Sequence, residues 1–294
     1  MSSDFDEEEK NEELEETEEQ PEEEMEAEVE GKGSLSGKGG VYSLLFPKGK
    51  DVRYVFSAMA TMLNDAAFSL GPEGVKLRAT DNSKVSIIIL DIPASSLDEV
   101  NIGEEIKVGI SFDVLKKIMR RISSRDKVEF IVDKPQGKLH VVIYTKKGKE
   151  GGMYRKFSLS LIDVSMEDVP EPNLEYPIRI TADLDSMLDI IAAANDISEV
   201  VSFTATTSQF IIRDEGEGGK SIESIYQSND ELFHEYVVNA EGSASYSAKQ
   251  ILGFMSQMRQ ICDAVTMEFA TDKPLKLTFN FSTGSLLLYL LQRT

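Results

Sequence analysis

From Val41 onward, hydrophobic residues gather in short runs of the length of β-strands, divided by polar segments. Short runs rich in β-branched and aromatic residues recur, separated by turn sequences such as Gly71-Pro72-Glu73-Gly74 and Lys134-Pro135-Gln136-Gly137. In the first half the predicted strands are residues 41–46, 66–70, 74–80, 84–92, 105–110, 127–132, 138–145 and 156–162. In the second half they are residues 176–182, 200–206, 209–215, 221–227, 234–240, 265–271, 275–281 and 285–291.

Four stretches have helical periodicity instead, with apolar residues three and four positions apart. They are residues 51–66, 111–123, 184–194 and 247–261. The expected apolar faces are Val52, Val55, Phe56, Met59, Met62, Leu63 and Ala66; Val114, Leu115, Ile118, Met119 and Ile122; Leu184, Met187, Leu188 and Ile191; and Ile251, Phe254, Met255 and Met258.

The second half of the chain repeats the order of elements in the first half. In each half, a tripeptide Asp-Lys-Pro follows the strand after the second helix, at Asp133-Lys134-Pro135 and at Asp272-Lys273-Pro274. The pattern predicts an α+β fold of two duplicated domains, each a strand-rich layer with two helices on one face. We place the domains at residues 41–162 and 177–294, joined by an extended connector at residues 163–176.

Charge separates the N-terminus from the rest of the chain, whose formal net charge is -21. Residues 1–30 hold 17 acidic residues and one lysine, a net charge of -16, and almost no aliphatic side chains. Such a segment cannot bury enough apolar surface to fold, so residues 1–40 are predicted to be a disordered acidic tail ending in a Gly/Ser linker. The remaining 264 residues carry only -5.

Composition excludes several classes of protein. One cysteine, Cys262, and two histidines, His140 and His234, argue against a disulfide framework and against a metal site. No apolar run is long enough to span a membrane and the acidic N-terminus is no secretory signal, so we expect a reducing compartment and neither cofactor nor membrane. No catalytic motif is present, and an enzyme is not expected. A hydrolase with an unrecognised carboxylate site remains an alternative.

The helix predicted at residues 111–123 carries a basic face opposite its apolar one. Arg125 lies just beyond it, and the face itself holds Lys116, Lys117, Arg120 and Arg121. Like charges four residues apart destabilise a helix slightly, and a phosphate backbone would offset that repulsion. A solvated basic face is the alternative. Because no aromatic residues are interleaved, the pattern indicates backbone contact without sequence readout.

DVRYVFSAMATMLNDAAFSLGPEGVKLRATDNSKVSIIILD, at residues 51–91, and four later stretches together resemble the proliferating cell nuclear antigen family, in its archaeal type. Residues 51–91 are similar to the family's opening helix, hairpin and aliphatic strand. KVGISFDVLKKIMRR resembles its second helix, and LIDVSMEDVPEPNLEY resembles its interdomain connecting loop. TDKPLKLTFNF and LLLYLLQR are similar to its final strands. The resemblance covers residues 41–294 in a consistent order.

This resemblance implies a DNA polymerase sliding clamp, a ring of three subunits around double-stranded DNA. Sheets would lie outside, and two helices per domain would line the inner face. The other two subunits would be like or unlike this chain, and sheet edges at residues 153–161 and 221–227 would pair between subunits. Implied partners are DNA polymerase, clamp loader, flap endonuclease and DNA ligase, inside the cell with the chromosome. A clamp-like subunit specialised for damage signalling or for recruiting one enzyme is the alternative.

The resemblance also assigns residues to two sites. The DNA-facing residues are Arg53, Lys116, Lys117, Arg120, Arg121, Lys249 and, more loosely, Arg259. The partner-binding pocket consists of Val85, Val169, Pro170, Pro274 and Tyr289. Departures from the family pattern are the acidic Asp183, Asp185 and Asp189 and the neutral Ala192 on the third helix, Thr80 beside the pocket, and Leu291-Gln292 after the tyrosine.

The acidic tail has no counterpart in this resemblance. One interpretation is a solubilising extension of the chain. Another is a DNA mimic that competes for the inner basic face or discourages wrong assembly.

Overall fold

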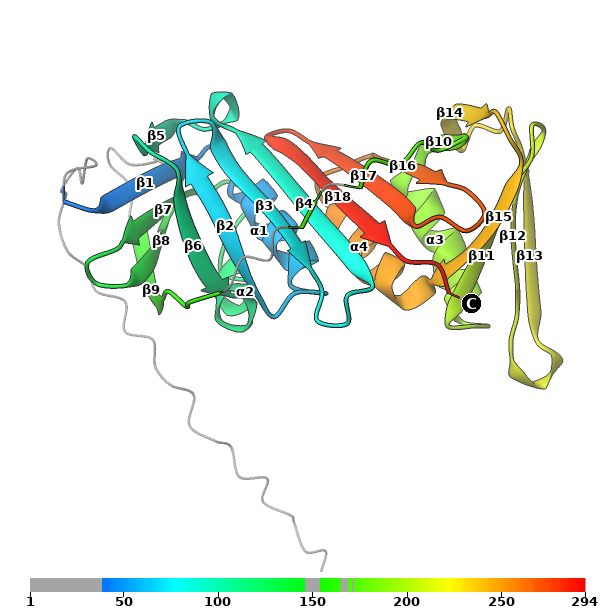
Figure 1. Cartoon of the computed structure of the whole chain (residues 1–294), viewed down its shortest axis with the longest axis horizontal. Helices are drawn as coiled ribbons and strands as arrows, with labels where there is room; N and C mark the ends of the chain where they lie inside the picture. The colour runs from blue at the N-terminus through cyan, green and yellow to red at the C-terminus, as the bar shows by residue number, and fades with distance from the viewer. Residues whose placement is uncertain (1–38, 146–153, 165–168, 171, 294) are drawn as a thin grey trace, which may run out of the picture.

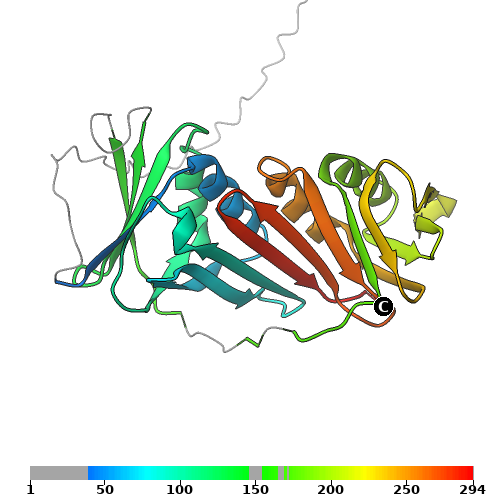
Figure 2. The ribbon, with the colours of Figure 1, turned by 90° about the horizontal axis from the view of Figure 1, so that it is seen from above.

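A computed structural model describes residues 39–145, 154–164, 169–170 and 172–293. The predicted disordered tail, apart from Gly39 and Gly40, lies outside these residues. The chain forms an elongated body in which the helices gather on one side and the sheets on the other (Figure 1, Figure 2). Within the described residues, no helix is both long enough and apolar enough to cross a membrane.

The elements follow the same order in the two halves of the chain. The first half contains β1 (Val41–Phe46), α1 (Gly49–Met59), β2 (Asp65–Gly71), β3 (Gly74–Thr80), β4 (Ser86–Pro93), the 3-10 turn η1 (Ala94–Ser96), β5 (Glu99–Asn101), β6 (Ile106–Ser111), α2 (Phe112–Met119), β7 (Lys127–Asp133), β8 (Lys138–Tyr144) and β9 (Tyr154–Ser160). The second half contains β10 (Ile178–Asp183), α3 (Leu184–Asn195), β11 (Val200–Ala205), β12 (Gln209–Glu215), η3 (Glu217–Gly219), β13 (Ser221–Gln227), β14 (Phe233–Val238), β15 (Gly242–Ser247), α4 (Ala248–Met258), β16 (Ala264–Phe269), β17 (Leu275–Phe281) and β18 (Gly284–Leu290).

The sheets show the duplication directly. The order β5-β1-β7-β8-β9 in the first half matches β14-β10-β16-β17-β18 in the second, and β4-β3-β2-β6 matches β13-β12-β11-β15. One additional pairing, β18 with β4, joins two of these four units into a nine-stranded sheet that crosses between the halves. The predicted α+β fold with internal duplication is therefore confirmed.

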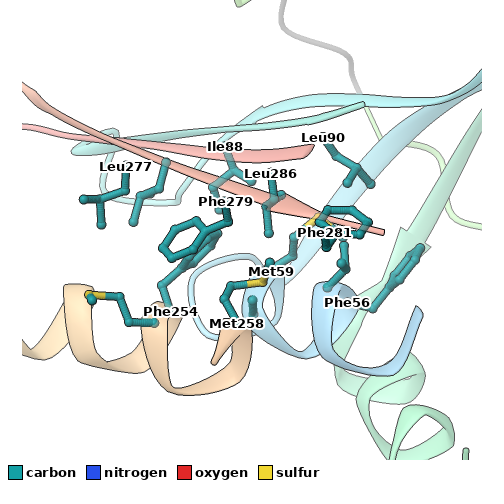
Figure 3. Close-up of a cluster of buried hydrophobic side chains, with 14 of the residues drawn as sticks. Phe56, Met59, Ile88, Leu90, Phe254, Met258, Leu277, Phe279, Phe281 and Leu286 are labelled. Atoms are coloured by element: carbon teal, nitrogen blue, oxygen red, sulfur yellow. The ribbon is translucent and has the colours of Figure 1, made fainter. Parts of the chain in front are cut away.

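The junction between the halves is an apolar layer beneath the β18–β4 pair. Leu288 lies opposite Ile88 in the antiparallel register, and both are fully buried. Phe254 and Met258 of α4 pack below these strands beside Phe56 and Met59 of α1, together with Leu90, Leu277, Phe279, Phe281 and Leu286 (Figure 3). The backbone also approaches closely here, since a Cβ on Gly284 would lie 2.3 Å from the carbonyl oxygen of Asp91. Only glycine fits at that position.

The four helices form one row over the sheets, in the order α2-α1-α4-α3 (Figure 1). Each helix buries one apolar stripe, such as Leu115 and Ile118 of α2, which are fully buried. The opposite stripe of each helix is left on the outer surface of the row. In this order, α2 lies at one end of the row and α3 lies at the other end.

The helix ends differ from the sequence-based prediction. Residues 51–66 were expected to form one helix, but α1 ends at Met59 and Ala66 belongs to β2. Residues 111–123 and 247–261 were likewise predicted too long, because α2 ends at Met119 and α4 at Met258, each followed by a tight turn. Hydrophobic residues in these turns pack on the same core. The helical spacing of apolar residues in the sequence therefore continues beyond the end of each helix. Val114, expected on the buried face of α2, is 39% exposed.

Two strands were missed. β15 has the sequence GSASYS, whose small polar residues carry little strand signal, and β5 has only three residues. β15 is held by its pairing with β11 along all six residues. Tertiary pairing thus determines this strand more than its own composition does.

Candidate functional site

The exposed surface of α2 concentrates positive charge. Phe112, Leu115 and Ile118 turn inward, so Lys116 and Lys117 are exposed on the opposite side. The turn after the helix then exposes Arg120 and Arg121. The four predicted basic side chains of this region therefore share one surface.

A cavity of about 420 Å³ lies between α1 and the end of α2, and we call it the α1–α2 basic cleft. Arg53 is fixed at its wall, because its Nη1 donates to the carbonyl oxygen of Ile122 at 3.0 Å and its guanidinium lies 5.1 Å from the Tyr54 ring centre. The arrangement suits an anion, since guanidinium groups bind phosphate oxygens with well-defined geometry. The lining residues are Lys50, Arg53, Tyr54, Arg120, Arg121, Ile122, Ser123 and Ser124.

The other two predicted basic residues lie on α4, in different environments. Lys249 is exposed in the first turn of the helix. Arg259, at its C-terminal end, forms an ion pair in which its Nε lies 3.0 Å from Oδ1 of Asp185 on α3. The acidic α3 thus offsets the charge of Arg259. Asp189 adds a further exposed carboxylate to α3.

Asp183 has a structural role at the start of α3. Its Oδ1 accepts a hydrogen bond of 2.8 Å from the backbone N–H of Ser186, which caps the helix N-terminus. Hydrogen bonds from the hydroxyl and the backbone of Ser186 lower the pKa of the Asp183 carboxyl. One of the acidic residues that depart from the family pattern is therefore explained by helix capping.

The internal repeat shows that the basic character belongs mainly to the first half. The two second helices align through equivalent backbone hydrogen bonds, from Phe112 N to Asn64 O and from Ala248 N to Glu199 O. In that alignment Lys116, Lys117, Arg120 and Arg121 fall on Leu252, Gly253, Ser256 and Gln257. The repeated fold therefore packs without basic residues at these positions, and the basic surface is a separate feature of the first half.

A second, smaller cavity of about 170 Å³ lies on the sheet side, where the chain end passes the connector. We call it the connector pocket. Its walls are mostly apolar, and the backbone N–H of Leu291 donates to the carbonyl oxygen of Val85 at 2.9 Å, which continues the β18–β4 pairing. The pocket fits a small hydrophobic side chain. Its lining residues are Lys84, Val85, Ser86, Ile87, Pro172, Pro274, Tyr289 and Leu291.

Three of the five residues assigned to this pocket, namely Val85, Pro274 and Tyr289, line it together. Val169 instead lines a neighbouring cavity with Thr80, and its carbonyl oxygen accepts a hydrogen bond of 3.2 Å from Arg78. Pro170 is exposed and lines neither cavity. Sequence reasoning missed Pro172, which lines the connector pocket although Pro170 does not; a further proline in the connector was the signal that could have indicated it.

The end of the connector is anchored beside this pocket. The ammonium group of Lys273 donates to the carbonyl oxygen of Glu175 at 2.5 Å and lies 5.9 Å from the Tyr176 ring centre. Tyr246 donates in turn to the carbonyl oxygen of Lys273 at 2.9 Å. Burial raises the pKa of the Tyr176 phenol. These contacts place the connector against the turn that carries Pro274.

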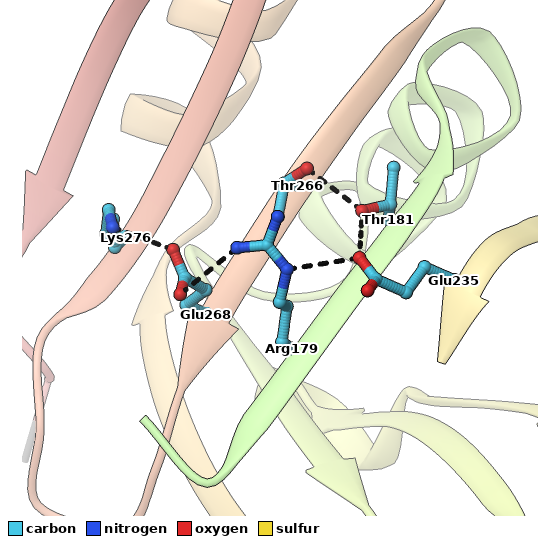
Figure 4. Close-up of polar contacts among 6 residues, drawn as sticks. All are labelled: Arg179, Thr181, Glu235, Thr266, Glu268 and Lys276. Atoms are coloured by element: carbon cyan, nitrogen blue, oxygen red, sulfur yellow. Dashed lines mark hydrogen bonds and ion pairs between the residues drawn. The ribbon is translucent and has the colours of Figure 1, made fainter. Parts of the chain in front are cut away.

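A chain of ion pairs crosses four strands of the same sheet face (Figure 4). Lys276 on β17 lies 2.8 Å from Glu268 on β16, whose other oxygen lies 3.4 Å from Arg179 on β10. Arg179 also pairs with Glu235 on β14 at 3.1 Å. Lys276 approaches Tyr289 as well, 6.0 Å from its ring centre. The network therefore links the wall of the connector pocket to the far edge of the sheet.

The predicted sheet edges lie at opposite ends of the molecule (Figure 1). Among the described residues β9 pairs only with β8, and β13 pairs only with β12. Ile225 on β13 is 49% exposed, so an apolar side chain lies on this edge strand. Met153, the first residue of one predicted edge, lies outside the described residues.

Within the described ranges, the residues with nucleophilic or metal-binding chemistry do not assemble into a site. Cys262 is buried, and burial raises the pKa of its thiol to about 12, which disfavours the reactive thiolate. His140 is buried in the β8 strand, where its Nδ1 lies 2.7 Å from the Ser158 hydroxyl. In the part of the chain that the structure describes, no three His, Cys, Asp or Glu residues gather as metal ligands.

Comparison with known proteins gives consistent matches along the chain. Residues 44–168 match the family model described as "Proliferating cell nuclear antigen, N-terminal domain". The chain is 32% identical over 240 residues to DNA polymerase sliding clamp 2 of Pyrobaculum aerophilum, covering 82% of this chain and 94% of that protein. It is 29% identical to the DNA polymerase sliding clamp of Thermofilum pendens, covering 84% and 96%.

Solved structures match as well. The proliferating cellular nuclear antigen of Entamoeba histolytica superposes with a TM-score of 0.77 at 20% identity, covering 86% of this chain and 99% of that one. PCNA from Thermococcus kodakaraensis gives a TM-score of 0.77 at 18% identity, covering 86% and 100%. At these identities the solved structures establish a shared fold. The evolutionary relationship rests on the sequence similarity to the Pyrobaculum aerophilum and Thermofilum pendens proteins.

Proposed function

The chain belongs to the proliferating cell nuclear antigen family of DNA polymerase sliding clamps, and on that premise we propose that it is one subunit of a trimeric ring that encircles duplex DNA and tethers a DNA polymerase. Its role is topological. The ring neither forms nor breaks a bond in DNA. Enzymes held on it gain processivity because a closed ring stays threaded on the DNA. Inside the cell, it would be found with the chromosome.

The observation that carries this proposal is the repetition of one sheet junction. Within the chain, β18 of the second half pairs with β4 of the first. By the internal duplication, β9 is the counterpart of β18, and β13 is the counterpart of β4. A second copy can therefore add its β13 to the free edge of β9 by the same pairing. Head-to-tail contacts of this kind generate closed rings when the rotation closes.

The charges at the two ends of the helix row support such a contact. The basic α2 lies at one end of the row and the acidic α3, with Asp185 and Asp189, lies at the other. Head-to-tail addition brings a basic end against an acidic end, which favours the correct orientation. The neighbour at this contact can be another copy of this chain. It can also be an unlike subunit whose helix row is basic at one end and acidic at the other.

The helix row would then line the hole and face the DNA. Its DNA-facing side chains are Arg53, Lys116, Lys117, Arg120, Arg121 and Lys249, which contact phosphates without reading bases. Arg259 contributes less, because Asp185 already opposes its charge. Uneven and modest attraction of this kind lets a closed ring slide.

The connector pocket would receive short hydrophobic motifs from partner proteins. DNA polymerase, clamp loader, flap endonuclease and DNA ligase are the proposed partners. Leu291 is 50% exposed at the rim and Pro172 closes the connector side, so the pocket is narrow and apolar. An aliphatic or aromatic anchor matches it better than a charged group does.

Retention on DNA tests the proposal. The chain is loaded onto circular duplex DNA by a cognate loader, and the same DNA is then cut once with a restriction enzyme. We expect retention at high salt on the circle and loss after cutting, because only a closed ring is held topologically. Equal retention on circular and linear DNA, or binding that disappears with salt in both cases, would rule out encirclement.

A further inference from the structure

The N-terminal segment and the α1–α2 basic cleft have opposite and concentrated charge. Residues 1–30, outside the described part of the structure, carry 17 acidic residues and one lysine. The cleft is lined by Lys50, Arg53, Arg120 and Arg121. Lys116 and Lys117 extend the same basic surface by one helical turn. None of the described residues that line the cleft is acidic.

We propose that residues 1–30 bind the α1–α2 basic cleft of their own chain and compete there with DNA phosphates. The segment is thus an internal occupant of the DNA-facing surface, a regulatory role beyond the clamp function itself. Carboxylates and phosphates are recognised by guanidinium groups through the same charge-assisted hydrogen bonds.

The chain geometry brings the segment within reach. The fold begins at β1, where the carbonyl oxygen of Gly40 accepts a hydrogen bond from Lys134 N, and β1 leads directly toward α1. Six strand residues span roughly 20 Å at about 3.3 Å each. A Gly/Ser linker such as residues 31–40 has a root-mean-square length of about 17 Å and a limit of about 35 Å. The end of β1, next to the helix that carries Lys50 and Arg53, therefore lies within the reach of this linker.

The cleft is also a better binding site than other basic positions. Several cations elsewhere on the described surface are paired with carboxylates, as in Arg179 with Glu235, Arg213 with Glu223 and Lys127 with Asp98. The lysine nearest the start of the fold, Lys134, lies 5.6 Å from the Tyr42 ring centre and has no arginine in its turn. A cluster of four cations around one cavity attracts a polyanion more strongly than isolated lysines do.

Tethering makes a weak contact effective. A short flexible linker holds its ligand at roughly millimolar effective concentration, so even low intrinsic affinity gives substantial occupancy. Duplex DNA has a higher charge density and displaces the segment when the ring is loaded. The segment thereby suppresses adventitious binding to DNA that has not been threaded through the ring. Salt weakens the contact, because the Debye length falls from about 10 Å at 0.1 M to about 3 Å at 1 M.

Cross-linking of the full chain locates the segment. A carbodiimide joins carboxylates directly to lysine amines, and mass spectrometry identifies the pairs. We expect links from residues 1–30 to Lys50, Lys116 and Lys117, with few to Lys76 and Lys220 as surface controls. Links mainly to Lys134 and Lys138 would overturn the cleft as the site. Links found only between isotopically distinct chains in a mixed sample would overturn binding within one chain.

A charge variant of equal length tests the competition. The variant replaces nine glutamates by glutamine, which changes the net charge of residues 1–30 from -16 to -7: Glu7, Glu8, Glu9, Glu12, Glu13, Glu15, Glu16, Glu18 and Glu19. At low salt it should bind a short linear duplex about three- to tenfold more tightly than the natural chain, and the gain should vanish at high salt.

The same nine substitutions in an Arg120→Ala, Arg121→Ala background separate the cleft from a general charge effect. There we expect little further gain, because the site of competition has been weakened. An equal gain in that background would show that residues 1–30 do not compete at the cleft. No gain in the natural background would show that residues 1–30 do not compete with DNA. Neither result bears on ring retention at high salt, so the proposed clamp function is judged separately.

Discussion

Asp51, in the first turn of α1, accepts a hydrogen bond of 3.0 Å from the hydroxyl of Thr283, 232 positions further along the chain. The Ser282 hydroxyl donates to the same carboxylate oxygen. Asp51 and Thr283 are each only 5% exposed. A buried carboxylate of the first half thus holds the β17–β18 turn of the second half, beside the β18–β4 pair. This contact fixes how the two halves meet.

Replacing Thr283 by valine should lower the free energy of unfolding by about 1–3 kcal/mol, because a buried hydrogen-bond partner of a carboxylate is lost while shape is retained. Urea unfolding followed by circular dichroism measures the change. Thr278→Val is a matched control on β17, since the Thr278 hydroxyl makes no hydrogen bond within the described residues. Equal effects of the two substitutions would contradict the importance of the contact.

Much of the fold could be predicted from the sequence because patterning and packing agree in most elements. Strands such as β1 and β3 begin and end where the β-branched and aromatic runs predict, and the two Asp-Lys-Pro tripeptides lie in equivalent turns. Helix ends could not be predicted, since Met62 and Ala66 continue the apolar period of α1 although the chain has already turned. β15 carries no strand signal of its own and depends on β11.

Less of the site could be predicted, because its contacts join distant segments. The basic residues of α2 stand out in the sequence, but the pairing of Arg259 with Asp185 joins two helices of the second half. The placement of Val169 beside Arg78, away from the connector pocket, likewise depends on how the connector folds back. Exposure and charge of single helices are local properties, whereas pairing between helices is a tertiary one.

The double substitution Lys117→Ala with Arg120→Ala should weaken DNA binding, while the ring should still assemble because strand pairing between β9 and β13 carries most of the proposed subunit contact. Each substitution removes one phosphate contact, so the slope of log affinity against log salt should fall by about two units. Fluorescence anisotropy on duplex DNA at several salt concentrations measures it, and light scattering reports assembly. Lys76→Ala with Lys107→Ala, on exposed strand positions of β3 and β6, is the control. If the control lowers the slope as much, the helix row is not the DNA-facing surface.

Asp183→Ala should destabilise the chain by about 0.5–2 kcal/mol at neutral pH, the usual effect of losing a helix N-cap. The folded pKa of Asp183 lies below its ordinary value of 3.8, so its stabilisation is present above that value and is lost as pH falls through the lowered pKa. The difference between natural and variant chains should therefore shrink in acid. Thermal unfolding at several pH values measures this. Asp196→Ala, at the other end of α3, should change stability little, and a comparable loss there would argue against capping.

Leu291→Ala should weaken binding of a short peptide with aliphatic and aromatic anchors by about three- to tenfold, because its exposed half lines the connector pocket. The thermal midpoint should change little, since half of the side chain is already in solvent. Isothermal calorimetry measures the affinity. Leu174→Ala, on the connector but outside the pocket lining, is the matched control. A larger effect from Leu174 would move the binding site along the connector.

Glu268→Gln and Glu235→Gln compare two carboxylates that share Arg179 (Figure 4). The Glu268 side chain is 14% exposed and also pairs with Lys276, whereas that of Glu235 is 45% exposed. Neutralising the shielded Glu268 leaves two cations facing each other without their shared anion, so a loss of about 1–3 kcal/mol is expected. Neutralising Glu235 removes a solvent-screened pair worth at most about 1 kcal/mol. Urea unfolding ranks the two variants, and a greater loss from Glu235 would show that burial does not govern this network.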